Sequence, residues 1–244
     1  MNLTIVGCWG AYPEKNEATS SYLLEEKGFH LLIDCGSGCL SQLQNFISLK
    51  QLDAVILSHY HHDHVADVGP LQYAMLIQGY LGADNLPLPI YAPGHDAIRF
   101  QSLTYRQVTI GRPIKGGEDM TIGPWKVSFL QTVHPVYCLA MKFQTQSKTF
   151  VYTADTSWSD GLVSFAKGAD LLLCEASLYD DDQAKESGHM TPAMAGRLAK
   201  EAGVSLLVLT HFPHFGDHRQ LLEMAQTQFD GKVVLAQPGV TFKI

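Results

Sequence analysis

The sequence predicts a mixed α/β protein (α+β / α/β) in which two β-sheets lie face to face and helices cover their outer surfaces. Short apolar, β-branched runs end in polar loops, which is typical of buried strands. In each half of the chain, consecutive strand-like runs come first, and strands that alternate with helical patterns follow. We therefore predict a single domain over residues 1–244, made of two halves that meet near residues 109–126.

The first half begins with three predicted strands, and residues 25–28 form a hairpin turn between the second and the third. The predicted strands cover residues 3–8, 20–24, 29–33, 53–57 and 90–93. Helical patterns follow Gly38, span residues 67–82 and recur near His95. Residues 85–89, which include two prolines, are predicted to form a rigid loop.

The second half opens on residues 109–123, which are polar and Gly-rich and are predicted to be a mobile connection. Strands are predicted over residues 127–130, 139–143, 149–156, 170–176 and 205–209, with residues 233–235 as the last. A helix is expected over residues 192–202, because Thr191 suits the N-cap and Pro192 the first helical position. A final helix is expected over residues 217–229.

Composition limits the classes of function. The chain is 46% hydrophobic and 17% charged, as is usual for a globular protein, and its net charge of −7 argues against a broad nucleic-acid-binding face. The N-terminus has the pattern of a strand and not of a signal peptide, and no apolar run approaches a membrane span. Five cysteines without a C-x-x-C pair are expected to be reduced thiols, so we expect a cytoplasmic protein.

Four residues with metal-binding side chains directly follow the strand at residues 53–57. They are His59, His61, Asp63 and His64. A strand that delivers such side chains into a loop supports them rigidly, and imidazole and carboxylate groups suit zinc. With 11 histidines in the whole chain, this density would rarely arise by chance. The stretch therefore predicts a metal site.

The pattern His59-x-His61-x-Asp63-His64 after an apolar strand resembles the signature of the metallo-β-lactamase superfamily. Its remaining positions are matched in order by three residues at the ends of apolar segments: His134, Asp155 and His211. The resemblance implies the four-layer αβ/βα sandwich of that fold and a dinuclear zinc site, with manganese as the alternative metal. It also implies the ligand assignment: His59, His61 and His134 for one ion, Asp63, His64 and His211 for the other, and Asp155 as the bridge.

Asp34-x-Gly36 resembles the first motif of the same superfamily. There the aspartate braces the metal loop, and a carboxylate that orients a ligand histidine is a sensible arrangement. The alternative is that Asp34 caps the helix that follows it.

Glu175 and His189 resemble a catalytic dyad of the ribonuclease Z branch, through Leu173-Cys174-Glu175-Ala176-Ser177 and Gly188-His189-Met190-Thr191. A carboxylate that holds one imidazole nitrogen favours the imidazolium form, which can protonate a leaving alkoxide. The alternative is that His189 is a helix-entry residue and that Glu175 is a solvated strand end. We favour the dyad because both residues lie at element ends, where ligands collect.

These residues predict a metal-dependent hydrolase, similar to ribonuclease Z, that cleaves a phosphodiester. Metal-activated hydroxide would attack phosphorus, Asp63 would steer its proton, and His189 would protonate the leaving group. The expected substrate is a small phosphodiester or nucleotide, and RNA is not favoured. The alternatives are a carboxyl ester or lactone hydrolase with the same site, and a non-catalytic protein that senses a ligand.

Two further expectations concern partners. Only two predicted strands and a turn lie between His134 and Asp155, so the inserted arm with which ribonuclease Z clamps transfer RNA is missing, and a tRNA 3′-end endonuclease is disfavoured. Residues 71–81 contain more large apolar side chains than one buried helix face requires, which indicates a homodimer patch. A helix buried between sheet and loop is the alternative.

Overall fold

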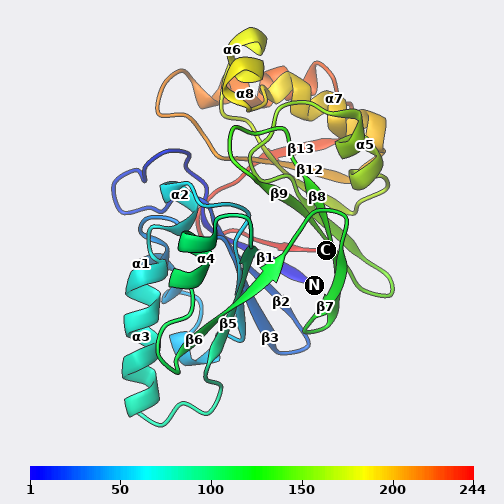
Figure 1. Ribbon diagram of the computed structural model, residues 1–244. Coiled ribbons are helices and arrows are strands. Elements are labelled where there is room, and N and C mark those ends of the chain that lie inside the picture. The colour runs from blue at the N-terminus through cyan, green and yellow to red at the C-terminus, as the bar shows by residue number, and fades with distance from the viewer. The chain divides into compact units, whose positions relative to one another are not determined.

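The computed structural model describes residues 1–244, and the chain divides into two units (Figure 1). Unit 1 contains Met1–Ile114 and Pro238–Lys243, and unit 2 contains Lys115–Gln237 together with Ile244. The boundary at Ile114 falls within the meeting region predicted from the sequence. That the two units form one domain stays a prediction.

Unit 1 contains one seven-stranded mixed sheet. Its order is β14 (Thr241–Lys243), β1 (Asn2–Gly7), β2 (Ser21–Glu26), β3 (Phe29–Ile33), β4 (Ala54–Ile56), β5 (Leu88–Pro93) and β6 (Thr109–Ile114). Neighbours from β14 to β3 pair antiparallel, and neighbours from β3 to β6 pair parallel. The parallel part places the ends of β3, β4 and β5 at one edge of the sheet.

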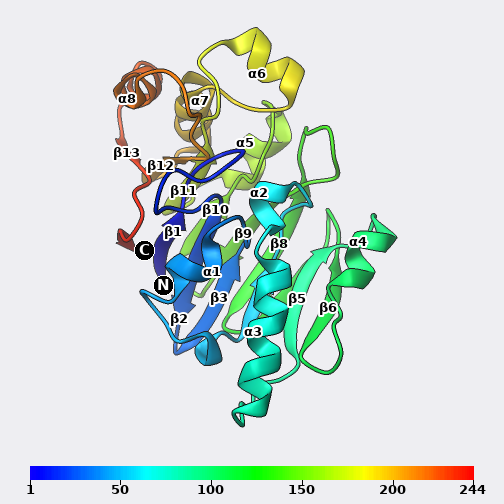
Figure 2. The ribbon, with the colours of Figure 1, turned by 90° about the vertical axis from the view of Figure 1, so that its left-hand side faces the viewer.

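The helices of unit 1 follow its parallel strands. They are α1 (Cys39–Leu43), η1 (Leu49–Gln51), α2 (His62–Val65), α3 (Val68–Tyr80) and α4 (Ala97–Ser102). The longer α3 and the short α1 lie on one face of the sheet (Figure 2). Leu43 and Leu71 of these helices are fully buried in one core with Leu32 and Val55 of the sheet. This core supports the loops at the ends of β3 and β4.

Unit 2 contains a second seven-stranded mixed sheet with the same pattern. Its order is β13 (Lys232–Leu235), β12 (Leu206–Thr210), β11 (Leu171–Glu175), β10 (Thr149–Tyr152), β9 (Leu139–Gln144), β8 (Trp125–Gln131) and β7 (Asp119–Ile122). Strands from β7 to β10 pair antiparallel, and strands from β10 to β13 pair parallel. The prediction of two mixed sheets is confirmed.

Four helices belong to unit 2: α5 (Asp160–Ala166), α6 (Asp181–Ser187), α7 (Pro192–Ala202) and α8 (His218–Gln226). The Thr191 side chain accepts a hydrogen bond from the Met194 amide at the start of α7, and left-handed Gly203 ends the helix. Its buried face packs against β11, β12, α5 and α8. Residues 192–202 are thus helical, as predicted.

The structure corrects the sequence prediction at two segments. Residues 109–123 are not a mobile connection, because they contain β6 and β7, and residues 88–89 belong to β5 and not to a loop. Both β6 and β7 are edge strands, which tolerate proline, glycine and charge because one side of the strand has no partner. The segment therefore lacks the apolar signal of a central strand.

Shorter elements also differ from prediction. Residues 233–235 are not in the last strand, because β14 returns to pair with β1 in unit 1. Helices α5 and α6 were not predicted, and α8 ends at Gln226, three residues before the predicted end at Phe229. No helix has the length and apolar character needed to cross a bilayer. All five cysteines are buried and none forms a disulfide.

Candidate metal-binding residues

The predicted metal-binding residues of unit 1 lie in one loop at the end of β4, partly within α2. The His59 ring centroid is 4.7 Å from that of His61 and 4.1 Å from that of His64. The Nε2 atom of His64 is 3.7 Å from Oδ2 of Asp63. The side chains of His59 and His64 are buried, so the rings are held by packing.

Asp34 braces this loop from the end of β3. Its carboxylate is fully buried, and Oδ2 accepts hydrogen bonds from Nδ1 of His64 at 2.7 Å and from the Ser58 hydroxyl at 2.9 Å. Oδ1 accepts from the Ser58 amide at 2.7 Å. The N-cap of α1 is Gly38, so Asp34 does not cap that helix. Asp34 therefore holds the metal loop and does not act as a helix cap.

Ser58 fixes the ring of His59 as well. The hydroxyl oxygen lies 3.0 Å from Nδ1 of His59. A hydroxyl has one proton, and a carboxylate accepts it, so the Ser58 proton goes to Asp34 and Nδ1–H of His59 donates to Ser58. This leaves the Nε2 lone pair of His59 available to a cation.

In unit 2 the predicted ligands surround Asp155, which follows β10. Nε2 of His211 is 3.5 Å and Nε2 of His134 is 3.9 Å from Oδ2 of Asp155. The three side chains are at most 7% exposed. Nδ1 of His134 donates to the Gly188 carbonyl at 2.9 Å, which directs its Nε2 toward Asp155. Burial lowers the pKa of His134, against the opposing effect of Asp155, so the imidazole is the neutral form that binds metals.

Glu175 and His189 are in direct contact. Nδ1 of His189 donates to Oε1 of Glu175 at 2.9 Å, and the Thr156 and Met190 amides donate to the same carboxylate at 2.7 and 3.2 Å. Glu175 is fully buried, and the His189 side chain is 20% exposed. Glu175 is therefore not a solvated strand end. The arrangement is that of a carboxylate that holds one nitrogen of a partly exposed imidazole.

His189 lies within the same group as two of the predicted ligands. Asp155, His189 and His211 each offer a ligand atom, and these atoms lie within 4.8 Å of one another. The His189 ring centroid is 5.2 Å from that of His134 and 5.5 Å from that of His211. At this distance His189 can donate a proton to a substrate bound at Asp155. The same distance would also allow His189 to act as a further metal ligand.

Ser177 joins this pair to His211. Its hydroxyl donates to Oε2 of Glu175 at 2.6 Å, and its oxygen lies 2.7 Å from Nδ1 of His211. By the argument applied to Ser58, Nδ1–H of His211 donates to Ser177 and the Nε2 lone pair is left for a cation. The sequence analysis missed both serines, although each lies two residues beyond the last residue of a parallel strand.

Left-handed backbone occurs at three of these strand ends. Asp34 has φ 56°, Ala154 has φ 51° and His211 has φ 58°, and none is a glycine. Such conformations are disfavoured for residues with a Cβ and persist where the surroundings impose them. Ala11, with φ 63°, donates its amide to Oδ2 of Asp63 at 2.8 Å. Four of the seven non-glycine residues with positive φ thus lie at or beside predicted site residues or contact one.

Two glycines permit close backbone contact. A Cβ on Gly36 would lie 2.0 Å from the Asp63 carbonyl oxygen, so no other residue fits between β3 and the metal loop. Gly188 has φ 79°, and a Cβ there would lie 2.5 Å from Cδ of Pro135. Gly188 is also the acceptor for His134, so its small size brings that carbonyl to the imidazole.

The donor set fits zinc. Four imidazoles, on His59, His64, His134 and His211, have Nδ1 held by a protein oxygen, which is how ligating histidines are usually oriented. Each is accompanied by a carboxylate in its own unit, and oxygen and imidazole donors together suit zinc or manganese. A cavity of about 380 Å³ in unit 1, lined in part by Tyr60, His62 and Arg99, lies beside the metal loop.

Two mixed sheets whose parallel strand ends carry histidines and aspartates oriented in this way define a class of metal-binding α/β proteins. Residues 30–212 match the family model described as beta-lactamase superfamily domain. The chain belongs to the metallo-β-lactamase superfamily and has its fold.

Three relatives resemble it over nearly the whole length of both chains. The probable metallo-hydrolase YhfI of Bacillus subtilis is 46% identical over all of both chains. The crystal structure of YhfI matches with a TM-score of 0.96 over 99% of this chain and 98% of that one. Human tRNase Z, short form, matches with a TM-score of 0.80 at 25% identity over 100% and 99% of the chains. Zn²⁺-bound PqqB of Methylobacterium extorquens, 16% identical, shares the fold over both whole chains with a TM-score of 0.76.

Proposed function

We propose that the chain is a metal-dependent hydrolase that cleaves a small phosphodiester or nucleotide. The observation that carries the proposal is the contact between Glu175 and His189, with His189 close to Asp155 and His211. Metal ligands alone would equally suit a binding protein. An oriented, partly exposed imidazole next to them supplies the proton that hydrolysis needs.

The metals are proposed to be two zinc ions, with manganese as the alternative. The family's motif order assigns His59, His61 and His134 to one ion, Asp63, His64 and His211 to the other, and Asp155 to both. The donor chemistry of each unit supports this, since each offers oriented imidazoles together with an aspartate. The names of two relatives, a probable metallo-hydrolase and a Zn²⁺-bound protein, agree with it.

When bound, the ions supply an activated water and neutralise charge on the phosphoryl oxygens. The protein groups carry the protons. Asp63, held by the Ala11 amide, accepts the proton of the attacking water. His189 donates a proton from Nε2 to the leaving oxygen, while Glu175 holds Nδ1 and stabilises the charged imidazole.

A small substrate is favoured over transfer RNA. Between His134 and Asp155 the chain forms only β9 and β10, which pair directly as a hairpin, so there is no arm to clamp a large RNA. The net charge of −7 also gives no broad attraction for a polyanion. Similarity to human tRNase Z therefore supports the type of chemistry and not the size of the substrate.

The test compares bond types on zinc-loaded protein. Bis(nitrophenyl) phosphate and nitrophenyl acetate release the same chromophore, so their kcat/KM values can be compared directly. We expect the phosphodiester to be preferred. Preference for the ester would point to an ester or lactone hydrolase, and turnover of neither, with metal bound, to a ligand-sensing protein.

A further inference from the structure

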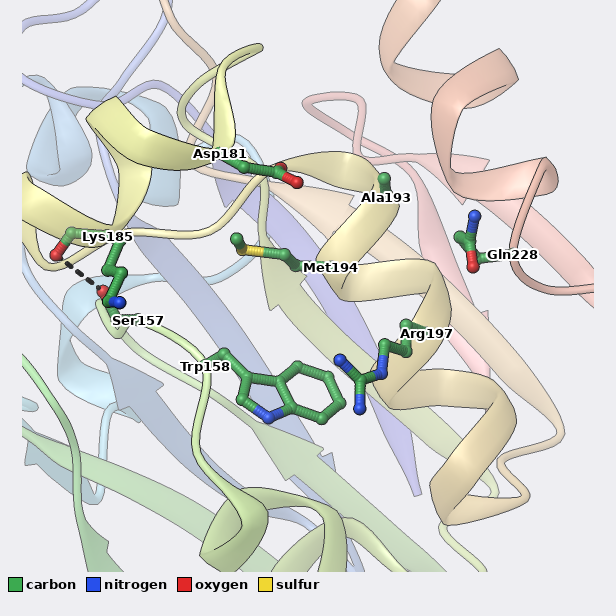
Figure 3. A pocket seen from close by; sticks show the side chains of 8 residues that line it. All are labelled: Ser157, Trp158, Asp181, Lys185, Ala193, Met194, Arg197 and Gln228. Carbon is green, nitrogen blue, oxygen red and sulfur yellow. Dashed lines mark hydrogen bonds between the residues drawn. The ribbon is translucent and has the colours of Figure 1, made fainter.

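Unit 2 contains a second cavity whose lining includes none of the predicted metal ligands and neither Glu175 nor His189. Its volume is about 430 Å³, which lies within the range of small-molecule sites. Its walls come from the loop after β10, from α6 and α7, and from a residue just after α8 (Figure 3). The residues that matter here are Ser157, Trp158, Asp181, Lys185, Met194 and Arg197.

The wall formed by the loop is anchored. Ser157 is 4% exposed, and its hydroxyl lies 3.3 Å from the carbonyl oxygens of Ala184, Lys185 and His189. The Trp158 indole N–H donates to Oδ1 of Asp160 at 3.3 Å. In Figure 3 the indole ring lies between Ser157 and Arg197. The wall that the loop contributes is thus formed by tethered groups.

The lining has an excess of positive charge. The guanidinium carbon of Arg197 lies 4.2 Å from the centre of the Trp158 ring, and only its Nε is used, in a 2.7 Å bond to Glu201. The terminal nitrogens of Arg197 and the ammonium of Lys185 take part in no ion pair or hydrogen bond. The one carboxylate in the lining, Asp181, already accepts a bond from the Thr191 hydroxyl at 2.7 Å.

We propose that this cavity binds a nucleoside monophosphate. Arg197 and Lys185 offer unused charged donors for the phosphate, and a guanidinium binds phosphate oxygens in pairs. Trp158 and Met194 provide an indole and a thioether against which a flat base packs. The cavity is large enough for both parts of the ligand together. The proposal does not depend on the proposed hydrolase activity, because it uses different residues.

Calorimetric titration of the zinc-loaded protein with adenosine 5′-monophosphate tests it. We expect saturable binding at submillimolar concentration, weakened at least about tenfold by Arg197→Glu and by Lys185→Glu, which reverse the charge that meets the phosphate. Trp158→Ala should weaken binding by a similar factor. All three side chains are partly or fully exposed, so the variants should fold; matching circular dichroism spectra check this.

Lys200→Glu is the matched control, because Lys200 is exposed on the same helix as Arg197 but does not line the cavity. It should leave affinity within about twofold, since screened surface charges at a distance contribute little. Inorganic phosphate and adenosine should each bind more weakly than the nucleotide. Three results would overturn the proposal: no binding of the nucleotide, equal affinity in all four variants, or inorganic phosphate binding as tightly as the nucleotide.

Discussion

Single hydroxyl groups decide the state of two predicted ligand histidines. Ser58 donates to Asp34 and Ser177 donates to Glu175, so each serine can only accept from its histidine, His59 or His211. An unbraced imidazole would divide between two tautomers and several orientations. The hydrogen bonds to Ser58 and Ser177 fix one tautomer and one orientation before a metal binds, which raises the affinity for the metal.

Ser177→Ala should therefore weaken zinc binding by roughly 10–100-fold, the usual effect of losing a group that orients a ligand. Competition with a chromophoric chelator measures this without reference to activity. Ser187→Ala is the control, because the Ser187 hydroxyl bonds only to the backbone carbonyls of Gln183 and Ala184 within α6 and to no predicted ligand. Ser177→Thr keeps the hydroxyl and should recover part of the affinity. Unchanged zinc affinity in Ser177→Ala would refute the bracing role.

His189→Ala should leave both metals bound and substrate affinity little changed, while turnover falls by roughly two to four orders of magnitude. The loss should be smallest for a nitrophenolate leaving group, which needs little protonation, and larger for an alkyl diester. Glu175→Gln should give a weaker version of the same pattern, since it changes only the orientation and charge of the imidazole.

Two outcomes would count against proton donation by His189. Equal losses on good and poor leaving groups, with metals retained, would show that His189 is not the proton donor. Loss of metal from His189→Ala would make it a ligand, which its closeness to Asp155 and His211 allows. Elemental analysis of the purified variant separates the two.

At the scale of elements, α3 presents an apolar stripe to solvent. Tyr73, Ile77, Tyr80 and Leu81 follow one another at helical spacing and are 52–73% exposed, whereas Leu71 and Met75 face the core. The helix is therefore not simply buried between sheet and loop. Exposed apolar stripes of this kind commonly pair two copies of a chain about a two-fold axis.

We therefore expect a homodimer in solution, and Ile77→Glu should shift it to monomer by placing a charge in the apolar interface. Ile98→Glu is the matched control, since Ile98 is an equally large, 83% exposed residue on α4 outside the stripe. Light scattering at high micromolar concentration measures the mass. If the wild-type protein is a monomer at that concentration, the prediction of a homodimer is wrong.

The elements also show which signals a sequence carries. Ala54–Ile56 and Leu206–Thr210 are central strands, so burial on both faces left continuous apolar runs and made them predictable. The edge strand β6 contains Gly111 and Pro113, and it was mistaken for a connection because an edge needs no such run.

The metal-loop residues were predictable from spacing because they are adjacent in sequence. The brace by Asp34 was also predicted, through its motif, but the bracing serines and the Gly188 carbonyl were not. Ser177 contacts His211 across 34 residues, and His134 contacts Gly188 across 54, so both depend on sheet order, which residue patterns alone do not encode. Serine is common after strands, so its role at such a position can be recognised only when its neighbours in the fold are known.

At the scale of the whole molecule, metal content should be two ions per chain by elemental analysis of protein never exposed to chelator. Because ions bind the folded and not the unfolded chain, chelation should lower the unfolding temperature and zinc should restore it. At a free zinc concentration about 1,000 times Kd, one site adds about 4 kcal/mol.

Asp155→Ala should retain at most one ion, since it removes the carboxylate next to both His134 and His211. Lys200→Ala serves as the control for handling losses, because Lys200 is exposed on α7. At most one ion in the wild-type protein, with no gain on zinc addition, would rule out the pair.

The two sheets have the same order of strand pairing along the chain, with antiparallel strands first and parallel strands after. This has a consequence for the ancestry of the protein. In each sheet, a left-handed residue follows the first parallel strand (Asp34, Ala154) and a bracing serine follows the second (Ser58, Ser177). A duplicated ancestral half would leave such corresponding positions long after the sequences diverged. The two copies would then have diverged in where they carry their ligands. In unit 1 the predicted ligands lie in the loop after the second parallel strand, and in unit 2 they lie at several strand ends.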